Sequence, residues 1–318
     1  MPAWAGDETY AGVLRAGRGP LFLQRPDGWL LPLEVERWCA DADAVDLDVL
    51  DRCEGTVLDV GCGPGRLVAA LAARGRQVLG LDVSEAAVAH TRRRLDPLLS
   101  GKAAKPPSGL SGKAAEPSPG AASAAPHIRP RRSRRGDSFA PPKGEPQVLP
   151  LGKAFAPRSG GGWESSHRRA AALPGSVFAP LPDEGHWGTA LLLDGNIGIG
   201  GDPSALLGRL ARVLVPRGLV LVETAPVDVD ERATVRLTGA GGAAGSPFPW
   251  ARLGTPALVR HARHAGWRTV AQWTAGGRCF VALRNRHTNS TAEPPKRAAL
   301  ISSQRVRKPS VDSPAPRS

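Results

Sequence analysis

Three glycines alternate with other residues directly after a short apolar segment of the chain. They are Gly61, Gly63 and Gly65, and an aspartate, Asp59, precedes the first of them by two positions. Glycines let the backbone turn tightly off a strand and approach a ligand, and a helix that starts after such a turn attracts a carboxylate or a phosphate. Asp82 ends the following apolar segment, where its carboxylate can accept two hydrogen bonds from ribose hydroxyls. The spacing therefore predicts a binding site for a ligand that carries a nucleoside.

Two classes of ligand fit this spacing. The dinucleotide site of nicotinamide-dependent oxidoreductases follows the pattern G-x-G-x-x-G/A, which puts a third small residue where this chain has Arg66. The arginine counts against that alternative because it would obstruct close packing of helix and strand. The spacing instead resembles the E/D-x-G-x-G-x-G pattern of class I S-adenosylmethionine-dependent methyltransferases, which Asp59 and the three glycines match. The resemblance extends over residues 51–97 and 173–284.

The resemblance implies a cofactor and a set of residue roles. The cofactor is expected to be S-adenosylmethionine, with residues 61–65, Cys62 among them, holding its methionine part. Asp59 is expected to order the loop, and Asp82 to bind the ribose. Adenine contacts are expected from the backbone of residues 178–181. The activity implied by the resemblance is methyl transfer, which we expect to act on a small-molecule acceptor.

A second polar group follows a later apolar segment, residues 189–193. Asp194 and Asn196 lie there on a glycine-rich stretch, at the sheet edge where doubly wound sheets bind ligands. In the family that the chain resembles, this position faces the transferred methyl group, so both residues are candidates for contact with cofactor or substrate. The alternative is a turn and a helix cap, a role that suits Asp202 better. Asp194 is the first candidate for a general base and His186 the second, although a lone histidine is more often a surface residue.

The acceptor is constrained by what the chain lacks around residues 194–197. An Asn-Pro-Pro-Tyr or Asp-Pro-Pro-Tyr motif is absent there, which counts against transfer to exocyclic amines of nucleic-acid bases, and so is the Pro-Cys pair of cytosine C5 chemistry. Residues 225–254 form a long connection, which we expect to act as a lid. Trp29, Trp38 and Trp250 are candidates to close over a small apolar substrate; the alternative is ordinary packing of an N-terminal cap.

Strand-like and helix-like segments alternate along the part of the chain that must position these residues. This alternation predicts an α/β fold, a doubly wound, mainly parallel seven-stranded Rossmann-like sheet with a C-terminal antiparallel hairpin. Residues 1–50 are expected to form an N-terminal cap. The strands are expected at 56–60, 77–81, 175–178, 189–193 and 219–223, the helices at 66–74, 84–95, 203–215 and 255–265, and the hairpin at 267–273 and 279–283.

The positive charge of the chain lies outside this predicted domain. The 318 residues carry a formal net charge of +13, and every lysine falls within 98–172 or 285–318. Both stretches are rich in Pro, Gly, Ala and Ser, so we predict a disordered basic insert and a disordered basic tail. The remainder, 1–97 with 173–284, carries a net charge of −1, and within it 51–97 and 173–284 form the predicted methyltransferase domain. The arginine cluster at 129–135 suits nucleic acid, but no aromatic residues are interleaved for base stacking, which favours a solvated linker.

Several classes of protein are excluded by composition. No run of about 18 apolar residues is present, and the start of the chain lacks a signal pattern, which argues against a membrane span and against secretion. The four cysteines are scattered, as in a reduced, cytoplasmic protein. His261 and His264 have no third ligand nearby, so no metal site is expected. The main hypothesis is a methyltransferase with a small-molecule acceptor; the alternatives are a nicotinamide-dependent oxidoreductase and a nucleic-acid-associated protein that uses the basic insert.

Overall fold

The computed structural model describes residues 7–100, 169–239 and 245–286. Within these ranges the chain forms two sheets. No helix among the described residues is long and apolar enough to cross a membrane. The expected disorder of the insert and the tail, and the arginine cluster at 129–135, concern residues that lie almost wholly outside the described ranges.

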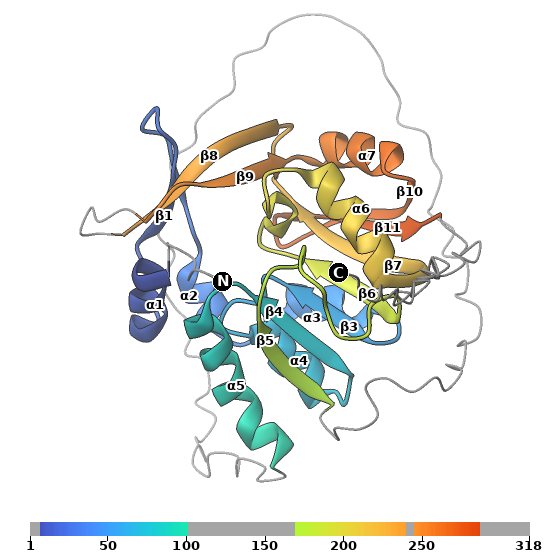
Figure 1. Ribbon diagram of the computed structural model, residues 1–318, viewed down its shortest axis with the longest axis horizontal. Helices are drawn as coiled ribbons and strands as arrows, with labels where there is room; N and C mark the ends of the chain where they lie inside the picture. The colour runs from blue at the N-terminus through green and yellow to red at the C-terminus, as the bar shows by residue number, and fades with distance from the viewer. Residues whose placement is uncertain (1–6, 101–168, 240–244, 287–318) are drawn as a thin grey trace, which may run out of the picture.

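The larger sheet has seven strands and confirms the predicted α/β fold (Figure 1). Strands β3, β4, β5, β6 and β7 run parallel to one another, and β11 is antiparallel to both β7 and β10. The order across the sheet is β10-β11-β7-β6-β3-β4-β5. Their bounds are β3 (Val57–Val60), β4 (Val78–Asp82), β5 (Ala170–Pro174), β6 (Trp187–Leu192), β7 (Leu214–Thr224), β10 (Trp267–Ala275) and β11 (Arg278–Asn285).

The order of the strands reverses at β3, and this reversal locates the site. The chain continues from β3 to β4 on one side, whereas β6 pairs with β3 on the other. The loops that leave β3 and β6 therefore diverge to opposite faces, and a crevice opens between them at the carboxyl ends of the strands. Asp59, the glycines and Asp194 all lie at this edge.

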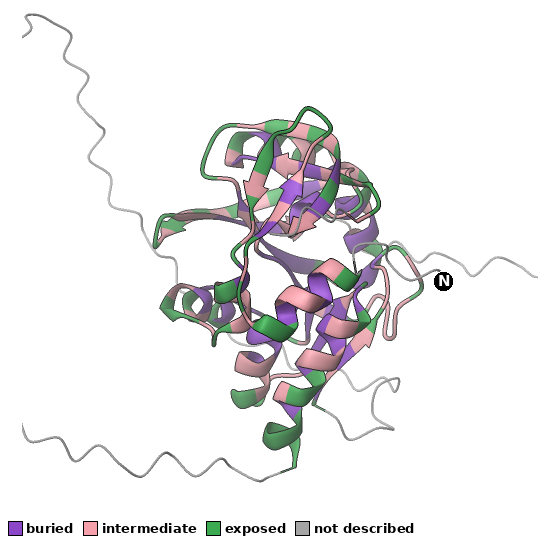
Figure 2. Ribbon diagram, turned by 90° about the vertical axis from the view of Figure 1, so that its left-hand side faces the viewer, coloured by how far each residue is buried: buried purple, intermediate pink, exposed green. Residues whose placement is uncertain are grey.

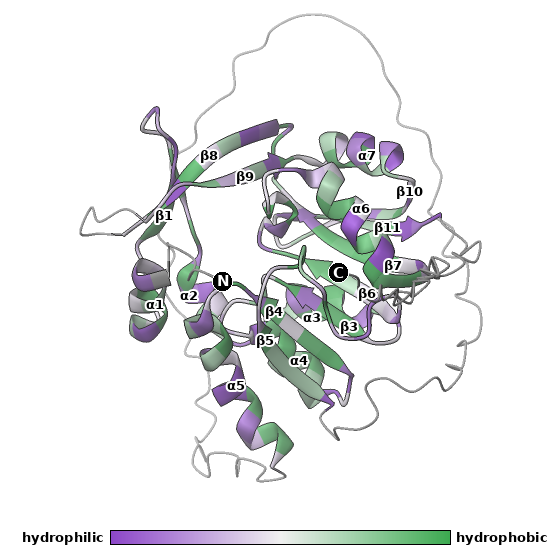
Figure 3. Cartoon of the chain, viewed as in Figure 1, coloured by the Kyte–Doolittle hydropathy of each residue, from purple (hydrophilic) through white to green (hydrophobic). Residues whose placement is uncertain are grey.

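Helices cover both faces of the sheet because successive strand residues point to opposite sides. Leu58 of β3 packs with the buried faces of α6 and α7, whereas its neighbour Val57 packs with α3 and α4 on the other face. The strands are largely hydrophobic, and buried positions line the inner sides of the helices (Figures 2 and 3). The bounds are α3 (Ala44–Asp51), α4 (Arg66–Ala73), α5 (Glu85–Leu99), α6 (Pro203–Val213) and α7 (Thr255–His264).

The third parallel strand lies five residues before its predicted position. β5 comprises Ala170–Pro174, and residues 175–178 form a turn instead of the predicted strand. Alanines are weak strand formers, so the segment carried no recognisable strand pattern. They fit here because β5 is an edge strand whose buried Ala170 and Ala172 pack closely beside β4. The first residues of β5 thus fall inside the 98–172 stretch that was expected to be disordered.

A second, four-stranded antiparallel sheet replaces the expected lid loop. Within residues 225–254 the chain forms β8 (Asp230–Gly239) and β9 (Phe248–Leu253), which pair with the N-terminal hairpin in the order β2-β1-β8-β9. We refer to this sheet together with α1 and α2 as the cap. Its other elements are α1 (Asp7–Ala16), β1 (Leu21–Gln24), β2 (Leu30–Pro32) and α2 (Val35–Cys39).

The cap sheet is held together by its own small apolar core. Val235 and Leu237 alternate with polar residues along β8 and pack against Leu21 and Leu23 of β1. This alternation is a half-buried strand pattern, and it is the signal in residues 225–254 that the loop interpretation missed. Figure 1 shows β1, β8 and β9 beside the seven-stranded sheet.

Candidate active site

A cavity of about 320 Å³ lies between the carboxyl edge of the seven-stranded sheet and the cap. Its volume falls within the usual range of small-molecule sites. One wall comes from the loops after β3, β4, β5 and β6, and the other from the cap. The loop wall comprises Val60–Pro64, Arg66, Leu81–Val83, Gly175–Phe178, Asp194, Asn196, Ile199 and Gly200, and the cap wall Tyr10, Leu21, Leu23, Leu33, Trp38, Leu237 and Phe248–Trp250.

The glycine loop is shaped by positive backbone angles and by close neighbours. Gly61 has φ +75°, and a Cβ there would lie 2.6 Å from Nδ2 of Asn196. That amide donates hydrogen bonds of 2.9 Å to the carbonyls of Val60 and Gly61. Asn196 therefore holds the loop from the cavity side. From the sequence, this residue could either contact the cofactor or substrate or belong to a turn.

Gly65 serves a different purpose from the two glycines before it. Gly61 and Gly63 line the cavity, whereas Gly65 lies behind it, next to Thr91 of α5. Its φ is +87°, and a Cβ would come within 2.5 Å of the Thr91 side chain. The third glycine of the pattern thus allows α4 and α5 to approach.

Asp82, the predicted ribose ligand, lies beside the glycine loop. Its carboxylate accepts hydrogen bonds of 2.9 Å from the backbone N–H groups of Gly63 and Ser84, and it lines the cavity. The end of β4 is thereby joined to the bend after β3. A carboxylate held in this way presents acceptor oxygens to the cavity beside the backbone of the loop.

Asp59 and Cys62 are both buried, but only Cys62 reaches the cavity wall. Oδ2 of Asp59 has no hydrogen-bond partner among the described residues, and burial raises the pKa of this carboxyl group to about 7, against the opposing charge of Arg66. Burial also raises the pKa of the Cys62 thiol well above its ordinary value. Both groups therefore hold their protons more readily than an ordinary aspartate or cysteine does.

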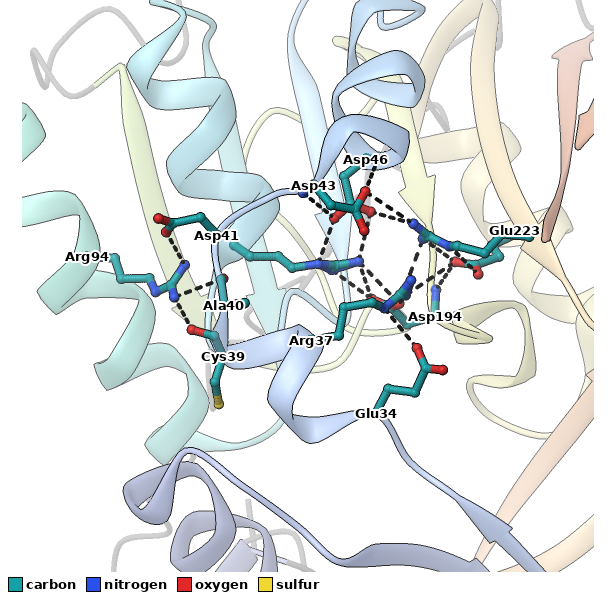
Figure 4. Close-up of polar contacts among 12 residues, drawn as sticks. Glu34, Arg37, Cys39, Ala40, Asp41, Asp43, Asp46, Arg94, Asp194 and Glu223 are labelled. Atoms are coloured by element: carbon teal, nitrogen blue, oxygen red, sulfur yellow. Dashed lines mark hydrogen bonds and ion pairs between the residues drawn. The ribbon is translucent and has the colours of Figure 1, made fainter. Parts of the chain in front are cut away.

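Asp194 belongs to a buried network of ion pairs (Figure 4). Arg66 bonds Asp46 and Asp194 at 3.0 Å each, and Arg37 of the cap also pairs with Asp194. Burial raises the pKa of Asp194, while Arg66 and Arg37 oppose this rise. The side chain expected to obstruct packing at position 66 extends instead into this network, where it is 3% exposed.

The same network continues along this edge of the sheet to β7 and β11. Arg278 of β11 bonds Glu223 at 2.7 Å and Asp46 at 2.8 Å. Glu223 in turn accepts the backbone N–H of Asp194 at 2.8 Å. Three arginines thus face three carboxylates, and Arg37 ties the cap to the loop after β6.

His186 is not brought to the cavity. It precedes β6, whereas Asp194 follows that strand, and a six-residue strand is about 20 Å long. Its ring is exposed and lies 3.0 Å from the Glu184 carbonyl. The second candidate base is therefore at the wrong end of the strand. Asp202 caps α6 by accepting from the N–H groups of Ser204 and Ala205, as predicted.

Two of the three candidate tryptophans line the cavity. Trp38 and Trp250 do, whereas Trp29 is 37% exposed outside it, beside the guanidinium groups of Arg25 and Arg252. Trp29 therefore does not close over a ligand in this cavity.

Sequence reasoning missed the other aromatic residues of the cap wall. Tyr10 packs edge-on against Trp38 with ring centroids 6.4 Å apart, and Phe248 packs edge-on against Trp250 at 6.2 Å. The apolar spacing of Tyr10, Val13 and Leu14 was an available signal for α1.

The mouth of the cavity is lined by residues 175–178, slightly before the expected adenine contacts at 178–181. Val83 and Phe178 are large, apolar and nearly half exposed there. Arg209 fixes this segment by donating to the carbonyls of Val177 at 2.8 Å and Ala179 at 2.7 Å.

His261 bonds Ser204 at 3.0 Å and Asp230 at 3.1 Å. The described part of the chain contains no group of three or more side chains suited to a metal ion.

Comparisons with known proteins give a domain match and a shared fold. Residues 57–104 match the family model of a methyltransferase domain. A search of curated proteins gives no significant match. A solved S-adenosylmethionine-dependent methyltransferase from Bacteroides fragilis, in complex with S-adenosyl-L-homocysteine, is similar in fold, with 15% identity, a TM-score of 0.54 and coverage of 89% of this chain and 96% of that chain.

Two further solved structures are more distant. A methyltransferase from Methanosarcina mazei has 12% identity and a TM-score of 0.44, covering 77% of this chain and 99% of that chain. The 1,6-didemethyltoxoflavin-N1-methyltransferase of Burkholderia thailandensis has 14% identity and a TM-score of 0.40, covering 77% of each chain. Residues 57–104, which contain the glycine loop, thus match a methyltransferase domain, and the chain shares its fold with a solved S-adenosylmethionine-dependent methyltransferase.

Proposed function

We propose that the cavity binds S-adenosylmethionine and that the enzyme transfers its methyl group to a small-molecule acceptor. One observation carries this proposal: the cavity has a polar backbone wall with Asp82 on one side and an apolar aromatic wall on the other. The first wall suits a nucleoside that carries an amino acid. The second suits a compact acceptor, since the cap covers the cavity.

The residues present fit the cofactor. Gly61 and Gly63 line the cavity in a left-handed conformation, and a Cβ would crowd the Asn196 side chain at Gly61 and the Tyr10 hydroxyl at Gly63. At these two positions the loop therefore presents backbone and no side chain to the cavity. Asp82 would hold the ribose hydroxyls, and the loop backbone would hold the methionine part. Val83 and Phe178 would flank the adenine at the mouth, because both present apolar surface there.

The contribution of the protein to the reaction is mainly positional. The cofactor supplies an activated methyl group. The cap wall orients the acceptor and excludes water, and the ion pair between Arg37 and Asp194 fastens the cap beside the loop. Holding two reactants in line can supply on the order of 7–11 kcal/mol of acceleration at best.

Binding of S-adenosylhomocysteine, measured by calorimetry, tests the proposal. We expect the wild-type protein to bind and Asp82→Ala to lose at least about tenfold in affinity, because each charge-assisted hydrogen bond contributes about 1.5–3 kcal/mol. Asp27→Ala is the matched control, since Asp27 lies in an exposed turn of the cap and bonds only nearby groups. A wild-type protein without affinity, or an Asp82→Ala variant that binds as tightly as wild type, contradicts the proposal.

The two alternatives have their own tests. A fluorescence titration with NADH tests the oxidoreductase alternative. Saturable binding of NADH without binding of S-adenosylhomocysteine would favour an oxidoreductase over a methyltransferase. Salt-sensitive nucleic-acid binding as the sole measurable activity would favour a nucleic-acid-associated protein. A reducing, cytoplasmic location fits the four cysteines, all of which are free thiols.

A further inference from the structure

The charged groups on the cavity wall are already engaged. Arg66 is paired with two carboxylates, one of which is Asp194, and Asp82 accepts from two backbone N–H groups. The described lining contains no lysine, histidine or glutamate. A charged acceptor would therefore lose water without gaining an opposite charge, which is costly. The cavity selects an uncharged acceptor.

The same groups are unsuited to removing a proton. Both oxygens of Asp194 accept guanidinium N–H groups, so a proton on either oxygen would displace an arginine. Tyr10 and Cys62 keep their protons, because burial raises the pKa of each well above its ordinary value. An acceptor in this cavity must attack with a lone pair that is available before any proton is lost.

The cap wall favours a planar acceptor. Four aromatic rings face the cavity in two edge-to-face pairs, Tyr10 with Trp38 and Phe248 with Trp250. Aromatic ligands gain stacking and edge contacts with such rings in addition to apolar burial. The leucines of the cap wall complete an apolar surface around these rings.

We propose that the acceptor is an uncharged aromatic amine or heteroaromatic nitrogen, and that the enzyme is an N-methyltransferase. This inference rests on the proposed function. The nitrogen lone pair forms the new N–C bond, and the C–S bond breaks with its electron pair left on sulfur. The sulfur of the cofactor leaves as a neutral thioether, and the methylated nitrogen carries the positive charge. If this nitrogen bears a proton, it then loses that proton to solvent.

A matched pair of probes tests the inference. The full-length protein is incubated with labelled S-adenosylmethionine and either 5-aminoindole or 5-hydroxyindole, which differ only in the attacking group. We expect methylation of the amine at least about tenfold faster near neutral pH, because the phenol must first ionise and its pKa is about 10. 5-Aminoindole-2-carboxylic acid, which keeps the same amine and is charged throughout this range, is expected to react at least about tenfold more slowly than 5-aminoindole.

The pH dependence gives a second readout. Between about pH 8 and 9 the rate with 5-aminoindole is expected to stay constant, whereas any rate with 5-hydroxyindole rises about tenfold as phenolate accumulates. A phenol methylated as fast as the amine, with a rate independent of pH, would reveal a general base and overturn the inference. Binding of S-adenosylhomocysteine with no methylation of the amine would overturn it too, while the cofactor proposal stands. Failure to bind S-adenosylhomocysteine removes both.

Variants of the cap wall locate the acceptor. Trp250→Ala is expected to raise KM for 5-aminoindole at least about tenfold, with affinity for S-adenosylhomocysteine nearly unchanged. Trp29→Ala is the control, because Trp29 lies in the same cap, directly before β2, but outside the cavity. Phe248→Leu serves as a second variant with the same expectation should Trp250→Ala fail to fold. An unchanged KM in a folded variant contradicts the placement.

Discussion

Arg66 shows how a single residue links stability to the site. It is buried, and its guanidinium joins Asp46 of α3 to Asp194 after β6. Removal of one partner of such a buried pair typically costs about 3–5 kcal/mol, because the other charge is left uncompensated. Asp194 is thus better understood as an anchor for the loop and for Arg37 than as a base. The residue that discriminated between two ligand classes in the sequence turns out to organise the site.

Asp59 makes the stability of the protein depend on pH. Its folded pKa is about 7, against 3.8 for an unperturbed aspartate, so the folded state binds the extra proton. Its contribution to stability is fully present below about pH 4 and is lost as the pH rises through 7. We predict that Asp59→Asn is more stable than wild type at pH 8, by up to about 4 kcal/mol, and that the difference shrinks towards pH 4.

Urea unfolding of both proteins across this pH range measures the effect. Shifts of other carboxyl groups, such as the lowered pKa of Glu184, cancel in the comparison because both proteins share them. A variant that is less stable by the same amount at every pH would show that Asp59 is already ionised and well stabilised in the folded state.

At the scale of elements, the turn from β3 into α4 depends on the approach of α5. Gly65 adopts φ +87° against Thr91, whereas Gly28 in the β1–β2 turn adopts φ +89°, and a Cβ added there would meet no atom within 4 Å. Both glycines therefore adopt a left-handed backbone conformation, but only Gly65 has close neighbours that a side chain would strike.

We predict that Gly65→Ala costs about 2–4 kcal/mol and Gly28→Ala about 1–2 kcal/mol. Both variants bear the strain of a left-handed backbone, and only the first adds a clash in a packed interface. The free energy of unfolding in urea checks this, with Gly28→Ala as the control. Equal losses of stability in the two variants would show that α5 moves aside freely and that packing against Thr91 does not require glycine at position 65.

At the scale of the whole molecule, the site is assembled from segments far apart in sequence. The cavity wall draws on the first 40 residues, on residues 60–83, and on residues 175–250, across the long stretch 101–168. β1 pairs with β8, with Leu21 opposite Gly239. The cap therefore exists only when the two ends of the domain come together.

We predict that replacing residues 101–168 with a flexible Gly/Ser linker leaves affinity for S-adenosylhomocysteine within about twofold of the full chain, because no described wall residue is removed. Deletion of the longer stretch 98–172 is expected to lower the melting temperature and weaken binding. It removes the buried Ala170 and Ala172, which pair with Val78 and Gly80 of β4. Calorimetry and thermal unfolding of both proteins decide, and equal behaviour of the two deletions would contradict the assignment of β5.

The sequence alone determined the glycine bend, the acidic strand end at Asp82 and the alternation of strands and helices. These features depend on local backbone demands and on apolar periodicity, both of which are written in neighbouring residues. The tertiary structure decided that β8 and β9 join the N-terminal hairpin, that Tyr10 and Phe248 face the cavity, and that Arg37 meets Asp194. Such pairings join residues more than a hundred positions apart, and their partners are chosen by packing rather than by spacing.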